Sequence, residues 1–264
     1  MLYTENATVV SNTPVNGNCF KMKLFAPNIA KNARPGQFVE VACGELQTAP
    51  LLKRPISIHN VYDEIVEIIY FVVGKGTDLL SKKQTGNTVE TVGPLGNGFF
   101  TENADNHILV GGGYGVPPMY YLAKEMVKAI NPKNIFVCIG AKTENLVLCY
   151  RDFIGLGINV CVATDDGSLG LKGFVTDSVK KILENNRKSA CVYACGPGIM
   201  EKNLYKLTEN YDFVKNCQCS MENVMACGIG VCNGCVIKIR QGEGWTYKRV
   251  CKDGPVFRGA EIIW

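Results

Sequence analysis

Histidine, excess charge and long apolar runs are scarce in this sequence of 264 residues. Its two histidines, His59 and His107, argue against a histidine metal site or a histidine general base as the centre of its chemistry. Lys and Arg number 28 and Asp and Glu 24, and the net charge of +4 gives no electrostatic reason to expect nucleic acid or an anionic membrane surface as the main partner. No apolar run reaches the roughly 18–20 residues that cross a bilayer, so we expect no membrane insertion.

We also expect no secretory signal, because the first residues lack the basic and then apolar layout of such a segment. The chain nevertheless holds 13 cysteines, and an odd, high count without a signal argues against a disulfide framework and for a reducing compartment. We therefore expect a cytoplasmic protein. Hydrophobic residues make up 47% and charged residues 20%, a globular mixture that excludes disorder and a fibrous structure.

Residues 1–101 are predicted to form an antiparallel β-barrel domain. Apolar and polar residues alternate over residues 20–25 and 38–42, and residues 64–73 fit a longer strand. Turn-forming clusters at residues 16–18 and 34–36 separate these segments. Closely spaced strands punctuated by Gly and Pro are typical of a small barrel.

Residues 102–215 are predicted to form a doubly wound parallel α/β domain. Short apolar segments indicate strands at residues 107–110, 134–139, 158–162 and 189–194. Helical patterns occupy residues 119–130, 175–185 and 199–210, and alternating β and α elements imply a parallel sheet. From about residue 216 the chain becomes rich in Cys and Gly, which predicts a third, small domain over residues 216–264.

The most specific motif lies in this third segment. Cys227, Cys232 and Cys235 follow a C-x4-C-x2-C spacing, and Cys251 comes later. This is the spacing of plant-type [2Fe–2S] ligation, in which three cysteines share a tight loop. The loop must wrap closely so that backbone N–H groups reach the sulfurs, and the interleaved glycines Gly228, Gly230 and Gly234 allow that conformation. We therefore predict a [2Fe–2S] cluster on these four cysteines.

Two other readings of these cysteines are open. Buried, inert thiols are common in proteins. A structural zinc site is a second possibility, although such sites usually show two short C-x2-C pairs, and Cys251 has no near partner. Cys217 and Cys219 lie just upstream and are interpreted as packing residues because of their distance from the loop.

A glycine turn at residues 111–118 predicts a dinucleotide site. Gly111, Gly113 and Gly115 follow a strand and open a helix, the context in which a turn binds a pyrophosphate. Pro118 replaces the last glycine of the usual pattern, and proline is well tolerated in a first helical turn. A purely structural strand–turn–helix is the alternative. Cys195, Gly196 and Pro197 close the fourth strand, at the carboxyl end where doubly wound sheets bind ligands.

In the barrel segment, Arg54 opens an Arg-Pro-Ile-Ser run, and its guanidinium is suited to a diphosphate. Gly76 and Thr77 precede an expected short helix at residues 78–82, where they offer backbone and hydroxyl donors to the same anion. The alternatives are a solvated strand edge for Arg54 and a simple helix cap for Thr77.

Together, R-P-x-S, GGG-x-G-x-PP and the later C-G-P turn resemble the ferredoxin–NADP reductase superfamily. The run M-A-C-G-I-G-V-C-N-G-C at residues 225–235, with V-C-K-D-G-P-V-F at 250–257, closely resembles the family of electron-transfer subunits of NAD-dependent dihydroorotate dehydrogenases. The resemblance covers essentially the whole chain.

The resemblance implies a set of cofactor-binding residues. It implies FAD at Arg54, Pro55, Ile56, Ser57, Ile69, Tyr70, Phe71, Gly76 and Thr77. It implies the cluster on the four cysteines already named, and NAD as substrate near Gly111, Gly113, Gly115, Gly196 and Pro197. Cys195 is the candidate catalytic residue, as a packing or polarising group where nicotinamide meets flavin, and an ordinary buried thiol is the alternative. Tyr114 departs from the family, in which a small aliphatic residue is more usual, and this puts the ribose contact in question.

The resemblance also implies a route for electrons and a partner. Dihydroorotate would be oxidised at FMN in a separate catalytic subunit, and electrons would pass through [2Fe–2S] and FAD to NAD⁺, in pyrimidine (UMP) biosynthesis. Two catalytic and two electron-transfer subunits would form a heterotetramer. Asp165 and Asp166 follow the third strand and favour NAD over NADP, because acidic residues suit a free ribose hydroxyl.

Two other functions stay open from the sequence. One is a related reductase subunit that serves ferredoxin, sulfur or hydrogenase complexes with the same cofactors. The other is a zinc-bearing binding module without redox turnover, which would leave the glycine turn and the Arg-Pro-Ile-Ser run without a role.

Overall fold

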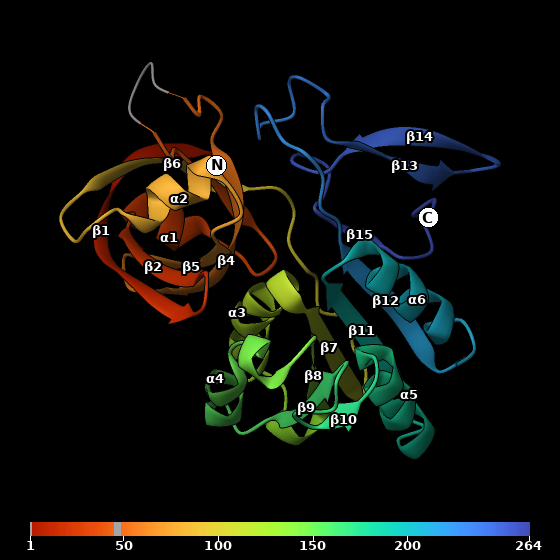
Figure 1. The fold of residues 1–264 in the computed structure, drawn as a ribbon. Helices are drawn as coiled ribbons and strands as arrows, with labels where there is room; N and C mark the ends of the chain where they lie inside the picture. The colour runs from red at the N-terminus through yellow and green to blue at the C-terminus, as the bar shows by residue number, and fades with distance from the viewer. Residues whose placement is uncertain (1, 45–48) are drawn as a thin grey trace. The chain divides into compact units, whose positions relative to one another are not determined.

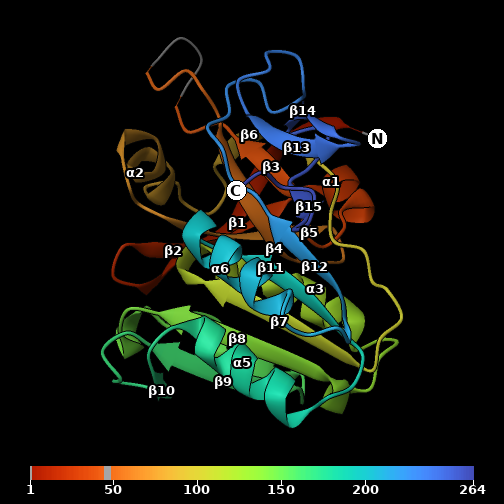
Figure 2. The same cartoon turned by 90° about the vertical axis from the view of Figure 1, so that its right-hand side faces the viewer.

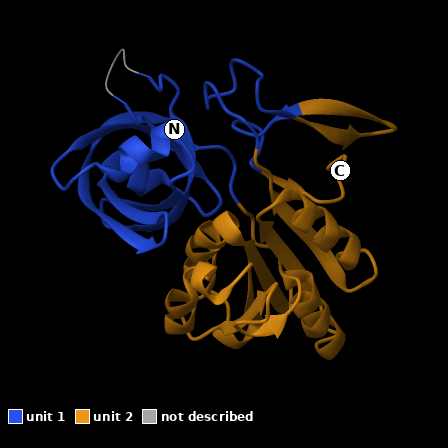
Figure 3. Cartoon of the chain, viewed as in Figure 1, with its two compact units in different colours: residues 1–98, 223–236, 248–255 blue, residues 99–222, 237–247, 256–264 orange. Residues whose placement is uncertain are grey.

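The computed structural model describes residues 2–44 and 49–264, and the chain divides into two compact units (Figure 3). Unit 1 comprises residues 1–98, 223–236 and 248–255, and unit 2 comprises residues 99–222, 237–247 and 256–264. The carboxyl-terminal segment therefore contributes to both units. Over the described residues, no helix combines the length and the apolar character needed to span a membrane.

A closed antiparallel barrel forms the body of unit 1 and confirms the predicted barrel (Figure 1). Its strand order is β1-β2-β5-β4-β3-β6. The elements are β1 (Tyr3–Asn16), β2 (Cys19–Phe25), α1 (Pro27–Asn32), β3 (Phe38–Val41), β4 (Arg54–Tyr62), β5 (Ile65–Phe71), α2 (Lys75–Ser81) and β6 (Thr88–Leu95).

The barrel follows from alternating side chains and from two tight turns. Met22 and Leu24 on β2 point inward and are fully buried, as is Ile68 on the neighbouring β5. Gly17 turns β1 into β2 with φ 47°, and Asp63 turns β4 into β5 with φ 49°. Both values lie in the left-handed region that Gly and Asp adopt most readily, so each turn residue suits its place.

A seven-stranded sheet forms the body of unit 2 and confirms the predicted doubly wound domain. Its order is β10-β9-β8-β7-β11-β12-β15, and every pairing is parallel except that of β15 with β12. The strands are β7 (Asn106–Gly112), β8 (Ile135–Ala141), β9 (Asn159–Thr164), β10 (Leu171–Lys172), β11 (Ala190–Cys195), β12 (Val214–Ser220) and β15 (Val256–Arg258).

Helices cover both faces of this sheet (Figure 2). Helices α3 and α4 pack on one face, and α5 and α6 pack on the other. The helical elements are α3 (Val116–Met126), α4 (Tyr150–Gly155), α5 (Val175–Asn185), α6 (Gly198–Thr208) and the 3-10 turns η1 (Gly113–Gly115), η2 (Pro132–Asn134) and η3 (Glu144–Leu146). Strand order reverses between β7 and β11, and the carboxyl ends of two such strands bound the crevice in which open α/β sheets bind ligands.

The structure adds strands that the sequence patterns did not reveal. Residues 214–220 form β12 inside the sheet, with Cys217 and Cys219 only 6% and 0% exposed, which fits their interpretation as packing residues. β15 is three residues long, too short to show a period, and it pairs antiparallel with β12. Between them, β13 (Val236–Gln241) and β14 (Gly244–Arg249) form a two-stranded sheet. The predicted domain boundaries after residues 101 and 215 were drawn by the cofactor that each segment is expected to bind. The division into two compact units does not test these boundaries, which stay a prediction.

The sheet of unit 2 contains a buried polar pair, Tyr193 and His107. The hydroxyl of Tyr193 lies 3.2 Å from Nδ1 of His107, and the two rings stack with centroids 6.0 Å apart. Tyr193 is fully buried, and His107 is 2% exposed. Burial lowers the pKa of His107, so the imidazole is neutral at pH 7 and uses the hydroxyl as its partner.

Removal of the Tyr193 hydroxyl tests this pair. We expect Tyr193→Phe to lower the free energy of unfolding by about 1–3 kcal/mol, because a buried ring nitrogen loses its partner while the aromatic packing remains. Tyr247→Phe is the matched control, since the Tyr247 side chain is 55% exposed and the change should stay within about 0.5 kcal/mol. Urea unfolding followed by circular dichroism measures both, and equal effects would contradict the assignment.

Candidate cofactor sites

The four predicted cluster cysteines gather in unit 1. Cys227, Cys232 and Cys235 lie on the loop before β13, and Cys251 follows β14. All four are free thiols. Gly228 and Gly230 have φ of 66° and 84°, so the loop uses the left-handed turns that its glycines permit.

Backbone N–H groups point at the cysteine sulfurs. The N–H of Cys232 donates to Sγ of Cys227 at 3.5 Å, and that of Cys251 donates to Sγ of Cys235 at 3.4 Å. The N–H of Gly234 donates to Sγ of Cys232 at 3.4 Å. Such donors stabilise thiolates, the form in which cysteine binds a metal.

The pKa values follow from these surroundings. For Cys227, burial raises the pKa, but N–H donors that include those of Cys232 and Ile229 outweigh it and bring the pKa to about 6. For Cys251, burial and the neighbouring Cys235 sulfur raise the pKa to about 12. Cysteine binds a metal as the thiolate, so a bound metal ion would displace the protons of these thiols.

The sulfurs are arranged as two neighbouring pairs. Cys227 lies against Cys232, and Cys235 lies against Cys251. Within the described chain, no three of the four sulfurs lie within 4.8 Å of one another. A structural zinc ion needs four ligands around one centre, whereas two irons accept two thiolates each. The donor set therefore fits a binuclear iron cluster better than zinc.

A salt bridge holds the fourth cysteine against the loop. Nε and Nη2 of Arg249 donate to the two carboxylate oxygens of Asp253 at 2.9 and 3.0 Å, and Nη1 donates to the carbonyl of Gly230 at 2.9 Å. This forked geometry is the most specific that arginine makes. It restrains the turn around Cys251 relative to the cluster loop.

Glu40 of the barrel lies against the cluster loop. An added Cβ on Gly228 would come within 2.6 Å of Cγ of Glu40, so the contact needs glycine. The Glu40 carboxyl is 3% exposed, and neither oxygen has a hydrogen-bond partner within the described residues. Burial raises its pKa to about 7, against the opposing effects of Lys53 and Arg54. Glu40 is a site residue that the sequence analysis missed.

The structure brings Arg54 and Gly76 together, as predicted for a shared anion site. Nη1 of Arg54 donates to the carbonyls of Leu52 and Lys53, at 2.7 and 3.3 Å. A Cβ on Gly76 would lie 2.9 Å from Nε of Arg54, so the guanidinium packs directly against the backbone of Gly76. An arginine held in this way at the start of β4 fits an anionic group such as the diphosphate of FAD.

Thr77 serves as a cap for its own helix. Its Oγ1 accepts hydrogen bonds from the N–H groups of Val73 and Gly74, at 3.0 and 3.3 Å, and donates to the Gly74 carbonyl at 3.1 Å. The capping alternative raised from the sequence therefore describes the hydroxyl in this structure.

The other predicted flavin residues lie on the adjacent strands β4 and β5. Pro55 is exposed, Ser57 and Phe71 are half-buried, and Ile56 and Ile69 are buried. Tyr70 is 4% exposed, its hydroxyl donates to Oδ1 of Asn12 at 2.9 Å, and its ring stacks on Phe20. The pairing of β3 with β4 sets Glu40 opposite Pro55 and Val41 opposite Arg54. The Arg-Pro-Ile-Ser strand is thus next to the strand that meets the cluster loop.

In unit 2 the two predicted nucleotide turns are in direct contact. β7 and β11 pair in parallel, with Gly111 opposite Cys195. A Cβ on Gly115 would overlap the backbone of Cys195, and a Cβ on Gly196 would lie 3.1 Å from the backbone of Gly112. The turns therefore meet backbone to backbone at the strand-order reversal, the place where open α/β sheets generally bind ligands.

Exposure differs among the residues of these turns. Gly113 has φ 52° and open space around it, Pro197 is exposed, and Tyr114 is 60% exposed. The Cys195 side chain is 1% exposed, and burial raises its pKa well above the ordinary value. A neutral, enclosed thiol fits the packing role.

Glu201 is a second buried carboxyl that the sequence analysis missed. It lies in the first turn of α6, is 1% exposed, and accepts hydrogen bonds from the N–H groups of Gly196 and Ser220. Burial raises its pKa well above the ordinary value, which favours the protonated form. Glu201 thereby ties the end of β11 to the end of β12. In the sequence, the signal that could have pointed to Glu201 was its position in the first helical turn after the C-G-P turn.

The acidic residues proposed to favour NAD follow β9. Asp165 and Asp166 are exposed, and their N–H groups donate to the carbonyls of Ala141 and Lys142 at the end of β8, at 3.1 and 3.3 Å. Oδ1 of Asp166 accepts from the N–H and hydroxyl of Ser168. Asp165 and Asp166 therefore lie next to the end of β8, where the cation Lys142 also lies.

Comparisons with known proteins agree with this geometry. A family model described as the iron-sulfur cluster binding domain of dihydroorotate dehydrogenase B matches residues 222–263. A second, the oxidoreductase NAD-binding domain, matches residues 109–206. The first range holds all four predicted cluster cysteines, and the second holds both predicted nucleotide turns.

Solved structures share the fold. The chain superposes with a TM-score of 0.85 and 32% identity, over 98% of this chain and 90% of the other, on a structure reported as the NADH-dependent reduced ferredoxin-NADP oxidoreductase in a study of flavin-based electron bifurcation. A ferredoxin NADP+ reductase from Neisseria gonorrhoeae with bound FAD and NADP has a TM-score of 0.67 at 13% identity, over 80% of this chain and 92% of the other. The latter likeness concerns the fold alone.

Curated relatives match over their full length. A protein of Desulforamulus reducens is 40% identical over 98% of both chains, and one of Caldanaerobacter subterraneus subsp. tengcongensis is 38% identical over 100% of both. Each is named dihydroorotate dehydrogenase B (NAD(+)), electron transfer subunit. This chain therefore belongs to the family of electron-transfer subunits of dihydroorotate dehydrogenase B.

Proposed function

We propose that this chain is the electron-transfer subunit of an NAD-dependent dihydroorotate dehydrogenase and holds FAD and a [2Fe–2S] cluster. One observation carries the proposal: the cluster loop and the Arg-Pro-Ile-Ser barrel belong to one compact unit and meet through Glu40 and Gly228. When bound, flavin supplies the exchange between hydride and single-electron transfer, and the cluster supplies single-electron transfer.

The residues of unit 1 act by binding and orienting. Cys227, Cys232, Cys235 and Cys251 would hold the irons, with N–H donors on the sulfurs. Arg54 would pair with the flavin diphosphate. Pro55, Ile56, Ser57, Ile69, Tyr70, Phe71, Gly76 and Thr77 would form the remaining flavin contacts.

The residues of unit 2 position the nucleotide. Gly111, Gly113 and Gly115 would admit the NAD pyrophosphate close to the backbone, and Gly196 and Pro197 would shape the other side of the crevice. Cys195 would act by packing beneath this turn, since its thiol is enclosed and neutral.

The proposal also covers assembly and location. The three cofactor segments would be residues 1–101 for FAD, 102–215 for NAD and 216–264 for the cluster. The partner is an FMN-containing catalytic subunit, in a heterotetramer of two catalytic and two electron-transfer chains within the cytoplasm. The reaction would serve pyrimidine biosynthesis.

Reconstitution with the partner tests the proposal. We expect the chain to co-purify with a tagged FMN-containing catalytic subunit, and the complex to reduce NAD⁺ with dihydroorotate, whereas neither chain alone does. Absorbance at the NADH band measures the reaction. A chain that uses NADH to reduce ferredoxin, fails to bind the catalytic subunit and gives no dihydroorotate-dependent NADH would favour the related ferredoxin reductase instead.

Substitution of a cluster cysteine separates the two cofactors. We expect Cys232→Ser to remove the [2Fe–2S] signal, from about two irons per flavin to near zero, while FAD remains bound to the barrel. Iron analysis, electron paramagnetic resonance and flavin absorbance measure the outcome. Cys217→Ser, on β12 of unit 2, should keep its iron. Unchanged iron in Cys232→Ser, or zinc in the wild-type protein, would contradict the ligand set.

The contact between the nucleotide turns gives a second variant. We expect Gly115→Ala to lower NADH-dependent dye reduction about tenfold or more at unchanged flavin content, because the new methyl group forces the Cys195 backbone away. Gly155→Ala at the end of α4 is the control, since no atom lies within 4 Å of the added Cβ. Equal activity of the two variants would show that the turns do not bind the nucleotide.

A further inference from the structure

Two cysteines outside the cofactor sites face each other in the sheet of unit 2. Cys138 on β8 and Cys161 on β9 are direct partners in the parallel register. Paired residues on neighbouring strands point to the same face, with backbones about 4.8 Å apart. This separation lies within the range of about 4.4–6.8 Å between Cα atoms that a disulfide spans. The register and the strand spacing of the pair are therefore compatible with a cross-strand disulfide.

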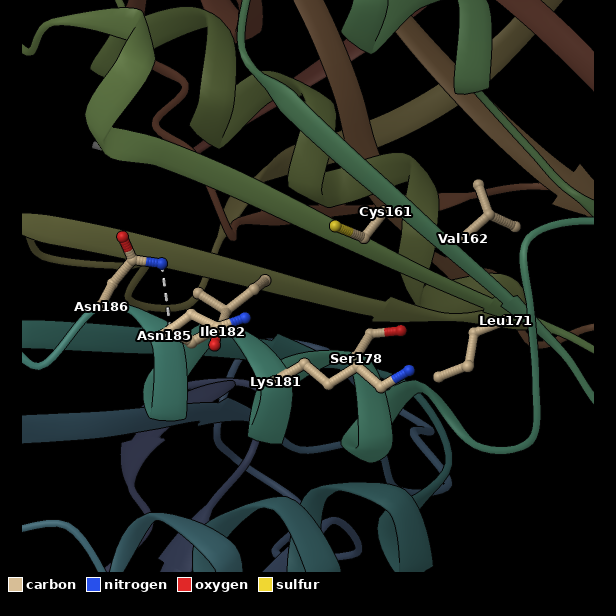
Figure 4. Close-up of a pocket in the computed structure, with 8 residues that line it drawn as sticks. All are labelled: Cys161, Val162, Leu171, Ser178, Lys181, Ile182, Asn185 and Asn186. Carbon is tan, nitrogen blue, oxygen red and sulfur yellow. Dashed lines mark hydrogen bonds between the residues drawn. The ribbon is translucent and has the colours of Figure 1, made fainter.

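The two thiols differ in their access to solvent. Cys138 is fully buried, whereas Cys161 is partly exposed and lines a pocket of about 380 Å³ between the sheet and α5 (Figure 4). In Figure 4 the Cys161 side chain lies across this pocket from the side chains of α5. The lining residues are Cys161, Val162, Leu171, Ser178, Lys181, Ile182, Asn185 and Asn186. A small reagent thus reaches Cys161 first.

The pair is also electronically unequal. The Cys138 thiol donates a hydrogen bond to the Cys161 sulfur, which lowers the pKa of Cys161 to about 7 against the opposing effect of burial. The same hydrogen bond and burial raise the pKa of Cys138. Lys181 is the one charged side chain among the eight described residues that line the pocket. Cys161 therefore has thiolate character at neutral pH, and the thiolate is the nucleophilic form.

We propose that Cys138 and Cys161 form a thiol-modification site for low-molecular-weight disulfides, with Cys161 as the attacking residue and Cys138 as the resolving residue. The Cys161 thiolate attacks one sulfur of the reagent, the reagent S–S bond breaks, and one thiolate leaves. Cys138 then loses its proton and attacks the Cys161 sulfur, and the second thiol leaves. The two cysteines are oxidised to one disulfide, and the reagent disulfide is reduced to two thiols.

This assignment is independent of the proposed electron-transfer function. Neither cysteine belongs to the flavin, cluster or nucleotide residues, and both lie on the face of the sheet that α5 covers. A low-pKa, accessible thiol next to a second thiol is the arrangement typical of redox-sensing cysteines.

Peptide mapping tests the proposal on the wild-type protein with its cofactors. The protein is treated at pH 7.5 with glutathione disulfide, at a concentration that leaves its visible absorbance unchanged, and is then blocked with N-ethylmaleimide and digested with trypsin. Cleavage after Lys133, Lys142, Arg151 and Lys172 places the two cysteines in separate peptides, residues 134–142 and 152–172. We expect these two peptides to become linked by a disulfide. Cys161 that carries only N-ethylmaleimide after this treatment would overturn the proposal.

Variants separate the two roles. Cys138→Ala should lose the linked peptides, accumulate the glutathione adduct on Cys161 and shift the pH of half-maximal Cys161 alkylation upward, because the hydrogen-bond donor is gone. Cys161→Ser should leave Cys138 without an adduct. Cys149→Ser is the matched control, since Cys149 is also partly exposed, and it should keep the linked peptides. A glutathione adduct on Cys138 in Cys161→Ser would overturn the order of attack.

Discussion

The arrangement of unit 1 depends on one close contact, between the bare backbone of Gly228 and the buried side chain of Glu40. Any larger residue at position 228 would collide with Cγ of Glu40, and its φ of 66° would be strained. Because Glu40 stands opposite Pro55 on the neighbouring strand, this contact joins the cluster loop to the strand that carries Arg54. Redox centres exchange electrons only at short range, so a loop that packs directly on the barrel is the arrangement that transfer requires.

The nucleotide turns of unit 2 use the same physical device. Gly115 and Gly196 let two chain segments meet backbone to backbone, and the buried carboxyl of Glu201 ties the second turn to the end of β12. In unit 1 the glycine Gly228 faces the buried acid Glu40, and in unit 2 the buried acid Glu201 accepts a hydrogen bond from the N–H of Gly196. Glycine removes the steric barrier to each of these close backbone contacts.

The sequence predicted the parts of this structure that are local. The spacing of the cluster cysteines is a property of one loop. The barrel and the parallel sheet follow from the alternation of apolar and polar residues along each strand and from the turn-forming residues between strands. Glu40 and Glu201 were missed because their significance arises from contacts with residues 188 and 19 positions away, at Gly228 and Ser220. β12 was missed because a strand that contains Cys217 and Cys219 looked like the beginning of the cysteine-rich segment. For Thr77, the sequence could not separate a helix cap from an anion site, because both place a Thr at the start of a helix.

The short strand β15 has a consequence for the solubility of fragments. β12 would otherwise be the last strand of its sheet, with a row of unpaired N–H and C=O groups open to solvent. β15 pairs with the carboxyl end of β12. Arg258 of β15 forms an ion pair with Glu102 at 2.9 Å, which stabilises this pairing. Open sheet edges are templates for edge-to-edge aggregation. A nucleotide domain excised at residue 222 would carry such an edge, and its isolation as a monomer would require a substitute for these three residues.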